Sequence, residues 1–211
     1  VLSPAFSNRF LELQFDDLPD EELQEILQRR CDLAPSYSAK LVEVMRDLQR
    51  RRQSSQIFAG KHGFITLRDL FKWAERQPVG YQQLAEEGYM LLAERLRSDE
   101  EKVVIRSVLE AHLPGAKLDP SVLYRQDPQS LARIQRFLDA SGVTDAARIV
   151  WTDSFQRMFA LVKKCVRNKG PVLLIGGTGC GKTSACQVLA TLLEQELRIL
   201  NFFAFANLSY L

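Results

Sequence analysis

The stretch GPVLLIGGTGCGKTSACQVLA, residues 170–190, decides the fold expected for the second part of the chain. Residues 176–183 match the phosphate-binding pattern G-x-x-x-x-G-K-[ST] at every position. The apolar run PVLLI precedes the glycines, and an amphipathic run follows them. This order predicts a buried strand, a phosphate-binding loop and a helix that begins where the loop ends. An ordinary glycine-rich turn is the alternative, and the pattern together with its context argues against it.

The residue types in this loop explain how it would hold a nucleotide. Glycines let backbone N–H groups turn toward phosphate oxygens, and the helix N-terminus adds positive potential. Lys182 would supply charge to the β and γ phosphates, and Thr183 would offer its hydroxyl to Mg²⁺ as a metal ligand. The residues predicted to bind the nucleotide are Gly176, Gly177, Thr178, Gly179, Cys180, Gly181, Lys182, Thr183 and Ser184.

Binding and hydrolysis are separate predictions. Hydrolysis needs an acidic residue at the end of a later strand, where it holds Mg²⁺ and orients water. The residues after the loop helix end in FFAFANLSYL, 202–211, which is apolar and contains no acidic residue. We therefore expect this chain on its own not to hydrolyse a nucleotide.

The residues before the loop predict helices. Within residues 18–113, apolar side chains recur at helical spacing. Thr66 and Asp69 have the spacing of a capping box at the start of one helix. The segments concerned are DEELQEILQRR (20–30), SYSAKLVEVMRDLQRRR (36–52), TLRDLFKWAERQ (66–77), YQQLAEEGYMLLAERLR (81–97) and SDEEKVVIRSVLEAHL (98–113).

A mixed, polar stretch with prolines and glycines, residues 114–148, predicts a linker that carries a short helix around SLARIQRFLDA. Beyond it, ARIVW (147–151) and RILNF (198–202) are further strand candidates, and SFQRMFALVKKCVRN (154–168) has the pattern of an amphipathic helix. The fold class predicted is therefore mainly α, with an α/β piece at the C-terminal end.

Composition limits the possible partners. The 211 residues include 46% hydrophobic and 26% charged side chains, enough for at least one sizeable core. The net charge of +2 gives no general argument for binding nucleic acid or an anionic membrane, and no apolar run approaches the roughly 20 residues that span a bilayer. No signal peptide is visible in VLSPAFSNRF, and the four cysteines lack metal-ligand spacing, which favours a reducing compartment.

Several stretches resemble the midasin family, the dynein-related AAA+ ATPases that string six ATPase modules along one chain. They are SPAFSNRF (3–10), LAPSYSAKLVEVMRDLQ (33–49), FAGKHGFITLRDLFKWA (58–74), IVWTDSFQRMFALV (149–162) and the phosphate-binding loop with its flanks. The resemblance extends from Val1 to about Asn201. It ends there, because the family continues with a polar stretch and this chain continues with FFAFANLSYL.

The resemblance implies an order of parts that spans two modules. Residues 1–17 would end one AAA+ α/β core, 18–113 would form its helical lid, and 114–148 would be a linker. Residues 149–211 would begin the next module with its first strand, P-loop and helix. ATP and Mg²⁺ would be the cofactors.

The resemblance also assigns two arginines. Arg9, in an Asn-Arg-Phe sequence, would be an arginine finger acting in trans on a neighbouring module. Arg68 would be the sensor-2 arginine that touches the nucleotide of its own module; a simple surface cation is the alternative for it. Trp151 and Thr152 would lie near an adenine pocket, with packing as the alternative. Because Arg9, Arg68 and Lys182 belong to three different sites, they would not complete one catalytic site together.

The function implied is that of a fragment of a mechanoenzyme in the nucleolus and nucleoplasm. Such an enzyme uses ATP hydrolysis to remove assembly factors from pre-60S ribosomal particles. Its partners would be neighbouring AAA+ modules, the particle and those factors, without a membrane or direct nucleic-acid contact. One alternative is a truncated, non-catalytic module that binds nucleotide or partners only. Another is an unrelated P-loop kinase or GTPase, which is disfavoured because those folds place their remaining strands after the loop.

Overall fold

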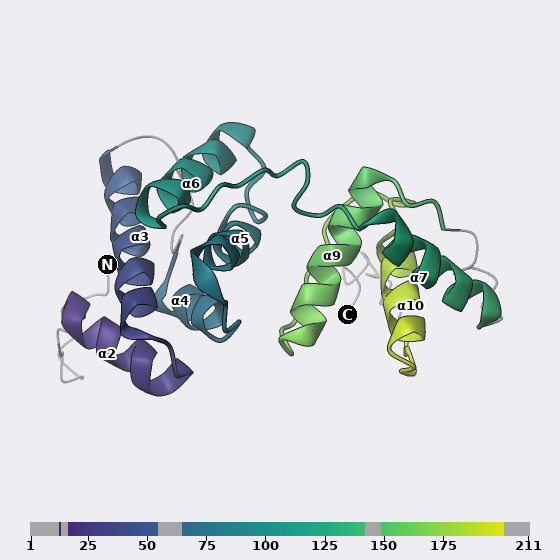
Figure 1. Ribbon diagram of the computed structural model, residues 1–211, viewed down its shortest axis with the longest axis horizontal. Coiled ribbons are helices and arrows are strands. Elements are labelled where there is room, and N and C mark those ends of the chain that lie inside the picture. The colour runs from purple at the N-terminus through teal and green to yellow at the C-terminus, as the bar shows by residue number, and fades with distance from the viewer. Residues whose placement is uncertain (1–12, 14–16, 55–64, 142–148, 201–211) are drawn as a thin grey trace, which may run out of the picture. The chain divides into compact units, whose positions relative to one another are not determined.

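The computed structural model describes residues 13, 17–54, 65–141 and 149–200, and Arg9 lies outside these ranges. The chain divides into two compact units, residues 1–118 and 119–211. Every regular element assigned in the described ranges is a helix, so the prediction of a mainly α fold is confirmed (Figure 1).

The first unit is a set of helices packed around one apolar core. Its helices are α2 (Asp20–Cys31), α3 (Pro35–Ser54), α4 (Leu67–Ala74), α5 (Gly80–Leu92) and α6 (Asp99–His112). Helix α3 contacts α2, α4 and α6, while α5 contacts α4 and α6. The amphipathic segments predicted from helical spacing therefore bury their apolar faces against one another.

Local sequence explains where two of these helices begin. Thr66 and Asp69 form the predicted capping box at the start of α4, and both of its hydrogen bonds are present. Ser98 caps α6 by accepting a hydrogen bond from the backbone N–H of Glu101. Such caps satisfy N–H groups that have no partner inside the helix.

Trp73 is buried in this core with no exposed surface. Its indole Nε1 donates a hydrogen bond to the carbonyl of Leu84, 2.9 Å away. A Cβ atom at Gly88 would lie 2.2 Å from the indole ring, so only glycine allows α5 to approach this closely. The other large side chains of this unit that are fully buried are Leu27, Leu41, Leu48, Leu70, Leu84, Leu92, Ile105, Leu109 and Leu113.

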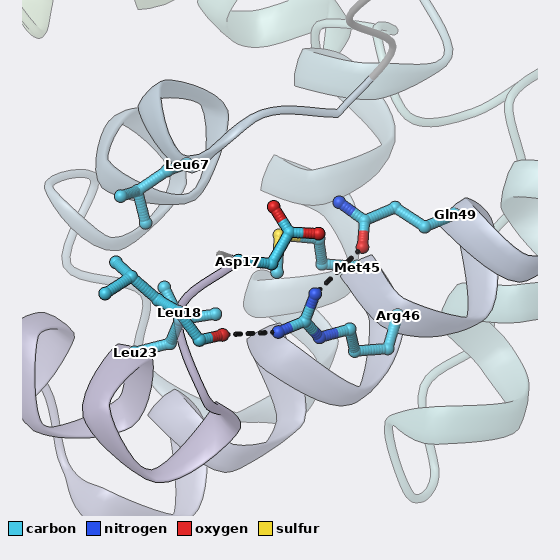
Figure 2. A pocket seen from close by; sticks show the side chains of 7 residues that line it. All are labelled: Asp17, Leu18, Leu23, Met45, Arg46, Gln49 and Leu67. Atoms are coloured by element: carbon cyan, nitrogen blue, oxygen red, sulfur yellow. Dashed lines mark hydrogen bonds between the residues drawn. The ribbon is translucent and has the colours of Figure 1, made fainter. Parts of the chain in front are cut away.

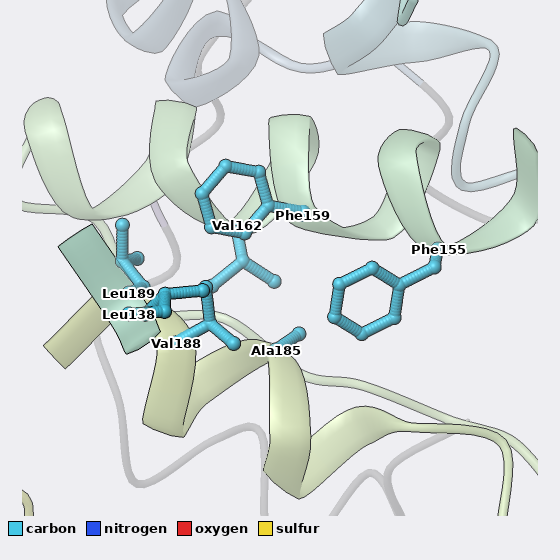
Figure 3. Close-up of a cluster of buried hydrophobic side chains, with 7 residues drawn as sticks. All are labelled: Leu138, Phe155, Phe159, Val162, Ala185, Val188 and Leu189. Carbon is cyan, nitrogen blue, oxygen red and sulfur yellow. The ribbon is translucent and has the colours of Figure 1, made fainter. Parts of the chain in front are cut away.

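The second unit contains α7 (Pro128–Ala140), α9 (Asp153–Arg167) and α10 (Lys182–Leu192). Helix α10 contacts both α7 and α9. Figure 3 shows side chains of all three helices meeting in one apolar cluster, with the two phenylalanine rings supplied by α9. Its members are Leu138, Phe155, Phe159, Val162, Ala185, Val188 and Leu189.

The predicted strands do not form among the residues that the structure describes. The segment PVLLI (171–175) is without assigned secondary structure, as are 149–151 and 195–200; residues 147–148 and 201–202 of the other candidates lie outside the described ranges. Leu174 packs against the apolar cluster, whereas Leu173 and Ile175 are 85% and 77% exposed. A strand needs a neighbour for its backbone hydrogen bonds, so the α/β part of the prediction is not confirmed.

Candidate functional site: the phosphate-binding loop and the lid arginine

The predicted phosphate-binding loop joins the extended segment to α10. Gly179 and Gly181 both have positive φ, of 81° and 82°, and Gly181 is the residue that precedes the first turn of α10. Residues with side chains avoid this backbone region, which explains the glycines at these two positions. Residues 176–180 are exposed, so the loop is open to a ligand.

Lys182 turns back over the loop from the first position of α10. Its Nζ donates hydrogen bonds to the carbonyls of Gly176 and Gly177, at 2.9 and 2.6 Å, and lies 3.3 Å from the Sγ of Cys180. The ammonium thus lies at the loop, beside the positive end of the α10 dipole. Thr183 follows it as an exposed residue, and Ser184 is half-buried.

Helix α9 supports the end of the loop. A Cβ atom at Gly181 would lie 3.3 Å from the ring of Phe155 and 3.4 Å from the terminal carbon of Met158. Behind the loop, Ala185 and Val188 of α10 are fully buried in the shared cluster. The helix side of the loop is therefore packed, while the extended segment on its other side has exposed apolar side chains.

Trp151 is part of this support. Its ring meets Phe155 and Phe159 edge-on, with centroids 5.3 and 5.2 Å apart, and its Nε1 donates to Oε1 of Gln135 on α7 at 3.2 Å. Thr152 caps α9 by accepting from the backbone N–H of Phe155. These contacts give Trp151 a packing role and Thr152 a capping role; proximity to an adenine pocket stays a prediction.

Gln156 is a buried polar residue that the sequence analysis missed. Its side chain accepts a hydrogen bond from the backbone N–H of Gln126 at 3.0 Å and donates one to the carbonyl of Trp151 at 2.9 Å. It therefore joins the segment before α7 to the segment before α9. Sequence pattern does not reveal this, because a glutamine in an amphipathic helix is usually exposed.

Arg68 lies in the first turn of α4, in the first unit, whereas the loop lies in the second. Its side chain is exposed and makes no hydrogen bond or ion pair within the part of the chain that the structure describes. The structure does not place Arg9. Of the two predicted arginines, only Arg68 can thus be described, and it is open to a ligand.

Asp69, next to Arg68, is buried and fully engaged. Its Oδ2 accepts from the backbone N–H of Thr66 at 2.7 Å, and its Oδ1 accepts from Nη2 of Arg95 at 2.8 Å. Burial alone would raise the pKa of Asp69. The hydrogen bonds from Arg95 and Thr66, with the charge of Arg95, outweigh it and lower the pKa below the usual value.

Other features of the described residues do not form a second site. A pocket near the start of α2 and α4 is lined by Asp17, Arg46 and Gln49 together with apolar side chains, and Figure 2 shows Arg46 donating to both Gln49 and the Leu18 carbonyl. His112 contacts Asp47 and Glu43 of α3. No group of three potential metal ligands occurs among the described residues, and none of their helices has the length and apolar character to cross a bilayer.

Both units of the chain are similar to regions of known proteins. Residues 22–114 match the midasin AAA lid domain, and residues 141–209 match the P-loop containing dynein motor region. The chain is 53% identical, over 208 residues, to midasin of Dictyostelium discoideum, and this match covers 95% of the chain. It is 31% identical, over 214 residues and 93% of its length, to midasin of Giardia intestinalis.

The chain belongs to the midasin family. The matches cover 4% of the length of each of these two midasins, so this chain corresponds to a small segment of its relatives. The lid match contains Arg68 and Asp69, and the P-loop match contains the whole loop from Gly176 to Thr183. The resemblance stated from sequence is thus confirmed, and the region belongs to the AAA+ P-loop ATPases.

Proposed function

We propose that this segment supplies the helical lid of one AAA+ module and the ATP-binding loop of the next in a midasin-type mechanoenzyme. The observation that carries the proposal is the geometry of the loop. Two left-handed glycines precede α10, and the ammonium of Lys182 lies at the exposed backbone between Gly176 and Cys180. This arrangement provides N–H groups, a helix N-terminus and a cation for phosphate oxygens.

Within this function, the chain's own residues act on the nucleotide as electrostatic and positioning groups. Lys182 would hold the β and γ phosphates, and Thr183 would place its hydroxyl on Mg²⁺, which supplies charge neutralisation when bound. Arg68 would neutralise charge on the nucleotide of the preceding module's own site, and Arg9 would act in trans at a module boundary. Coupling between these sites would let nucleotide state change the orientation of neighbouring modules.

The wider role that we propose is removal of assembly factors from pre-60S ribosomal particles in the nucleolus and nucleoplasm. It is supported by family membership alone, since the matches cover 4% of each relative. A test is to replace the lysine that corresponds to Lys182 in the full-length protein and to follow pre-60S composition. Accumulation of particles that retain assembly factors would support the role, and unchanged particles would contradict it.

A second candidate function is a non-catalytic nucleotide-binding or interaction module. The observation that favours it is the exposure of Leu173 and Ile175 beside the loop, since a rigid strand is needed to aim the loop N–H groups. A phosphate-release assay on the 211-residue chain tests whether this segment is catalytic by itself. We expect no turnover by the chain alone; turnover that disappears in Lys182→Ala would show that it is catalytic by itself.

A further inference from the structure

Arg68 depends on α4 for its position. Its side chain has no partner among the described residues, so the backbone of the first turn of α4 alone directs it. That helix has only eight residues, Leu67–Ala74. Helices this short are marginal by themselves, and their ends fray unless tertiary contacts hold them. Whatever fixes the first turn of α4 therefore fixes the Cα of Arg68 and the direction in which its side chain leaves the helix.

Two contacts of Asp69 fix this turn. One carboxylate oxygen accepts from the Thr66 backbone and hydroxyl, at 2.7 and 3.0 Å, which closes the helix start. The other oxygen accepts from Arg95, which follows α5 and whose Nε also donates to the Leu91 carbonyl at 3.1 Å. The Asp69 side chain is 12% exposed and that of Arg95 35%. The start of α4 is thus tied to the end of α5.

We propose that Asp69 and Arg95 are positioning residues for Arg68, holding it toward the terminal phosphate of the bound nucleotide. The inference rests on the proposed function of Arg68 as a nucleotide-contacting residue. Neither Asp69 nor Arg95 touches the nucleotide; they act through the first turn of α4. A displacement of about 1 Å in a charge-neutralising group is enough to lower a rate by up to ~100-fold. The pair therefore controls how well Arg68 acts.

A second ion pair in the same unit supplies the control. Arg76, just after the other end of α4, donates to the carboxylate of Glu87 at 2.8 Å, and the two side chains are 9% and 2% exposed. This pair also joins α4 to α5, and it is more buried than the Asp69–Arg95 pair. Loss of either pair should destabilise the lid, but only loss of the first should move Arg68.

The test uses the full-length midasin that carries this segment. ATP turnover and the midpoint of thermal unfolding are measured for the wild type and for Arg68→Ala, Asp69→Asn, Arg95→Met, Arg95→Lys and Glu87→Gln. The turnover lost in Arg68→Ala defines the Arg68-dependent part. We expect Asp69→Asn and Arg95→Met each to lower this part at least threefold through kcat, Arg95→Lys to restore some of it, and Glu87→Gln to leave it within twofold.

The double variants decide between positioning and stability. Asp69→Asn and Arg95→Met should lower turnover no further when Arg68 is already alanine, because the group that they position is gone. If these substitutions lowered turnover as much in the Arg68→Ala background as in the wild type, the positioning role would be overturned and a structural role would remain. An Arg68-dependent turnover unchanged by both single variants would also overturn it. If Arg68→Ala itself has no effect on turnover, the proposed function of Arg68 fails and this inference fails with it.

Discussion

The two units differ in how well the backbone that carries their predicted functional residues is packed. In the lid unit, Arg68 belongs to a helix whose capping box, ion pairs and apolar face are all engaged. In the P-loop unit, Lys182 follows a loop that packs against α9, while Leu173 and Ile175 before the loop are mostly exposed. Among the described residues, the lid therefore buries the apolar face of the helix that carries Arg68, whereas the P-loop unit has exposed apolar side chains beside its loop.

Tryptophan fluorescence can measure the stability of each unit separately. The chain contains two tryptophans, and Trp73 lies in the first unit and Trp151 in the second. A Trp151→Phe background thus reports on the lid, and a Trp73→Phe background reports on the P-loop unit. The predictions below on the free energy of unfolding use these two backgrounds and urea titration.

The largest difference in the free energy of unfolding is expected between two leucine-to-alanine substitutions, one in each unit. Leu109 in α6 is fully buried, so Leu109→Ala should lower the free energy of unfolding of the lid by about 3 kcal/mol. Leu173 is 85% exposed, so Leu173→Ala should change that of the P-loop unit by less than about 0.5 kcal/mol. Equal losses at both positions would show that Leu173 is buried in solution and would remove the contrast.

A smaller difference in the free energy of unfolding is expected between two glycine-to-alanine substitutions, one in each unit. Gly88→Ala places a methyl group 2.2 Å from the Trp73 ring and should cost about 2 kcal/mol in the lid. Gly181→Ala meets Phe155 at 3.3 Å and must also adopt φ of +82°, which should cost about 1 kcal/mol in the P-loop unit. Ala111→Gly, at an exposed position near the end of α6, measures the helix-propensity difference alone, at most about 1 kcal/mol. A Gly88→Ala variant as stable as the wild type would mean that Trp73 moves freely.

The smallest effect is expected on the pH dependence of the lid's free energy of unfolding, where Asp69→Asn should change only the slope against pH. The pKa of Asp69 is lowered in the folded lid, so its contribution is fully present above its ordinary value of 3.8 and is lost as pH falls through the lower folded value. The pKa values of Glu43, beside Lys40 and His112, and of Asp47, beside Arg51 and His112, are lowered too. We expect the lid to lose stability with acidification below about pH 4, and Asp69→Asn to make that loss less steep. An unchanged slope would contradict this role of Asp69.

Local pattern predicted most of the lid, because the apolar spacing of each helix, and the caps of α4 and α6, lie within a short segment. Thr66 and Asp69 are three residues apart, and their capping box formed as expected. Arg95 escaped prediction because it lies 26 residues beyond Asp69, and no local pattern couples the two. Whether residues 171–175 form a strand could not be decided from their apolar run either, since strand formation depends on partners elsewhere.

The candidate site was predictable to a similar extent. The loop pattern singled out Gly179, Gly181 and Lys182. The positive φ of the two glycines follows from their lack of a side chain. The pattern did not indicate that Phe155 and Met158 of α9 lie against Gly181, or that Gln156 joins two segments behind the loop. Those supports come from tertiary packing, in which burial of a particular side chain depends on all the helices at once.

Titration calorimetry of the 211-residue chain with ATP and Mg²⁺ measures whether this loop is a nucleotide site. We expect weak binding by the wild type and its loss in Lys182→Ala, with Trp151 fluorescence equal in the two proteins. Thr183→Ala, which removes only the predicted Mg²⁺ ligand, should weaken binding in the presence of Mg²⁺ and leave metal-free binding unchanged. Equal affinity of the wild type and Lys182→Ala for ATP, or no binding by either, would contradict the assignment of this loop as the nucleotide site.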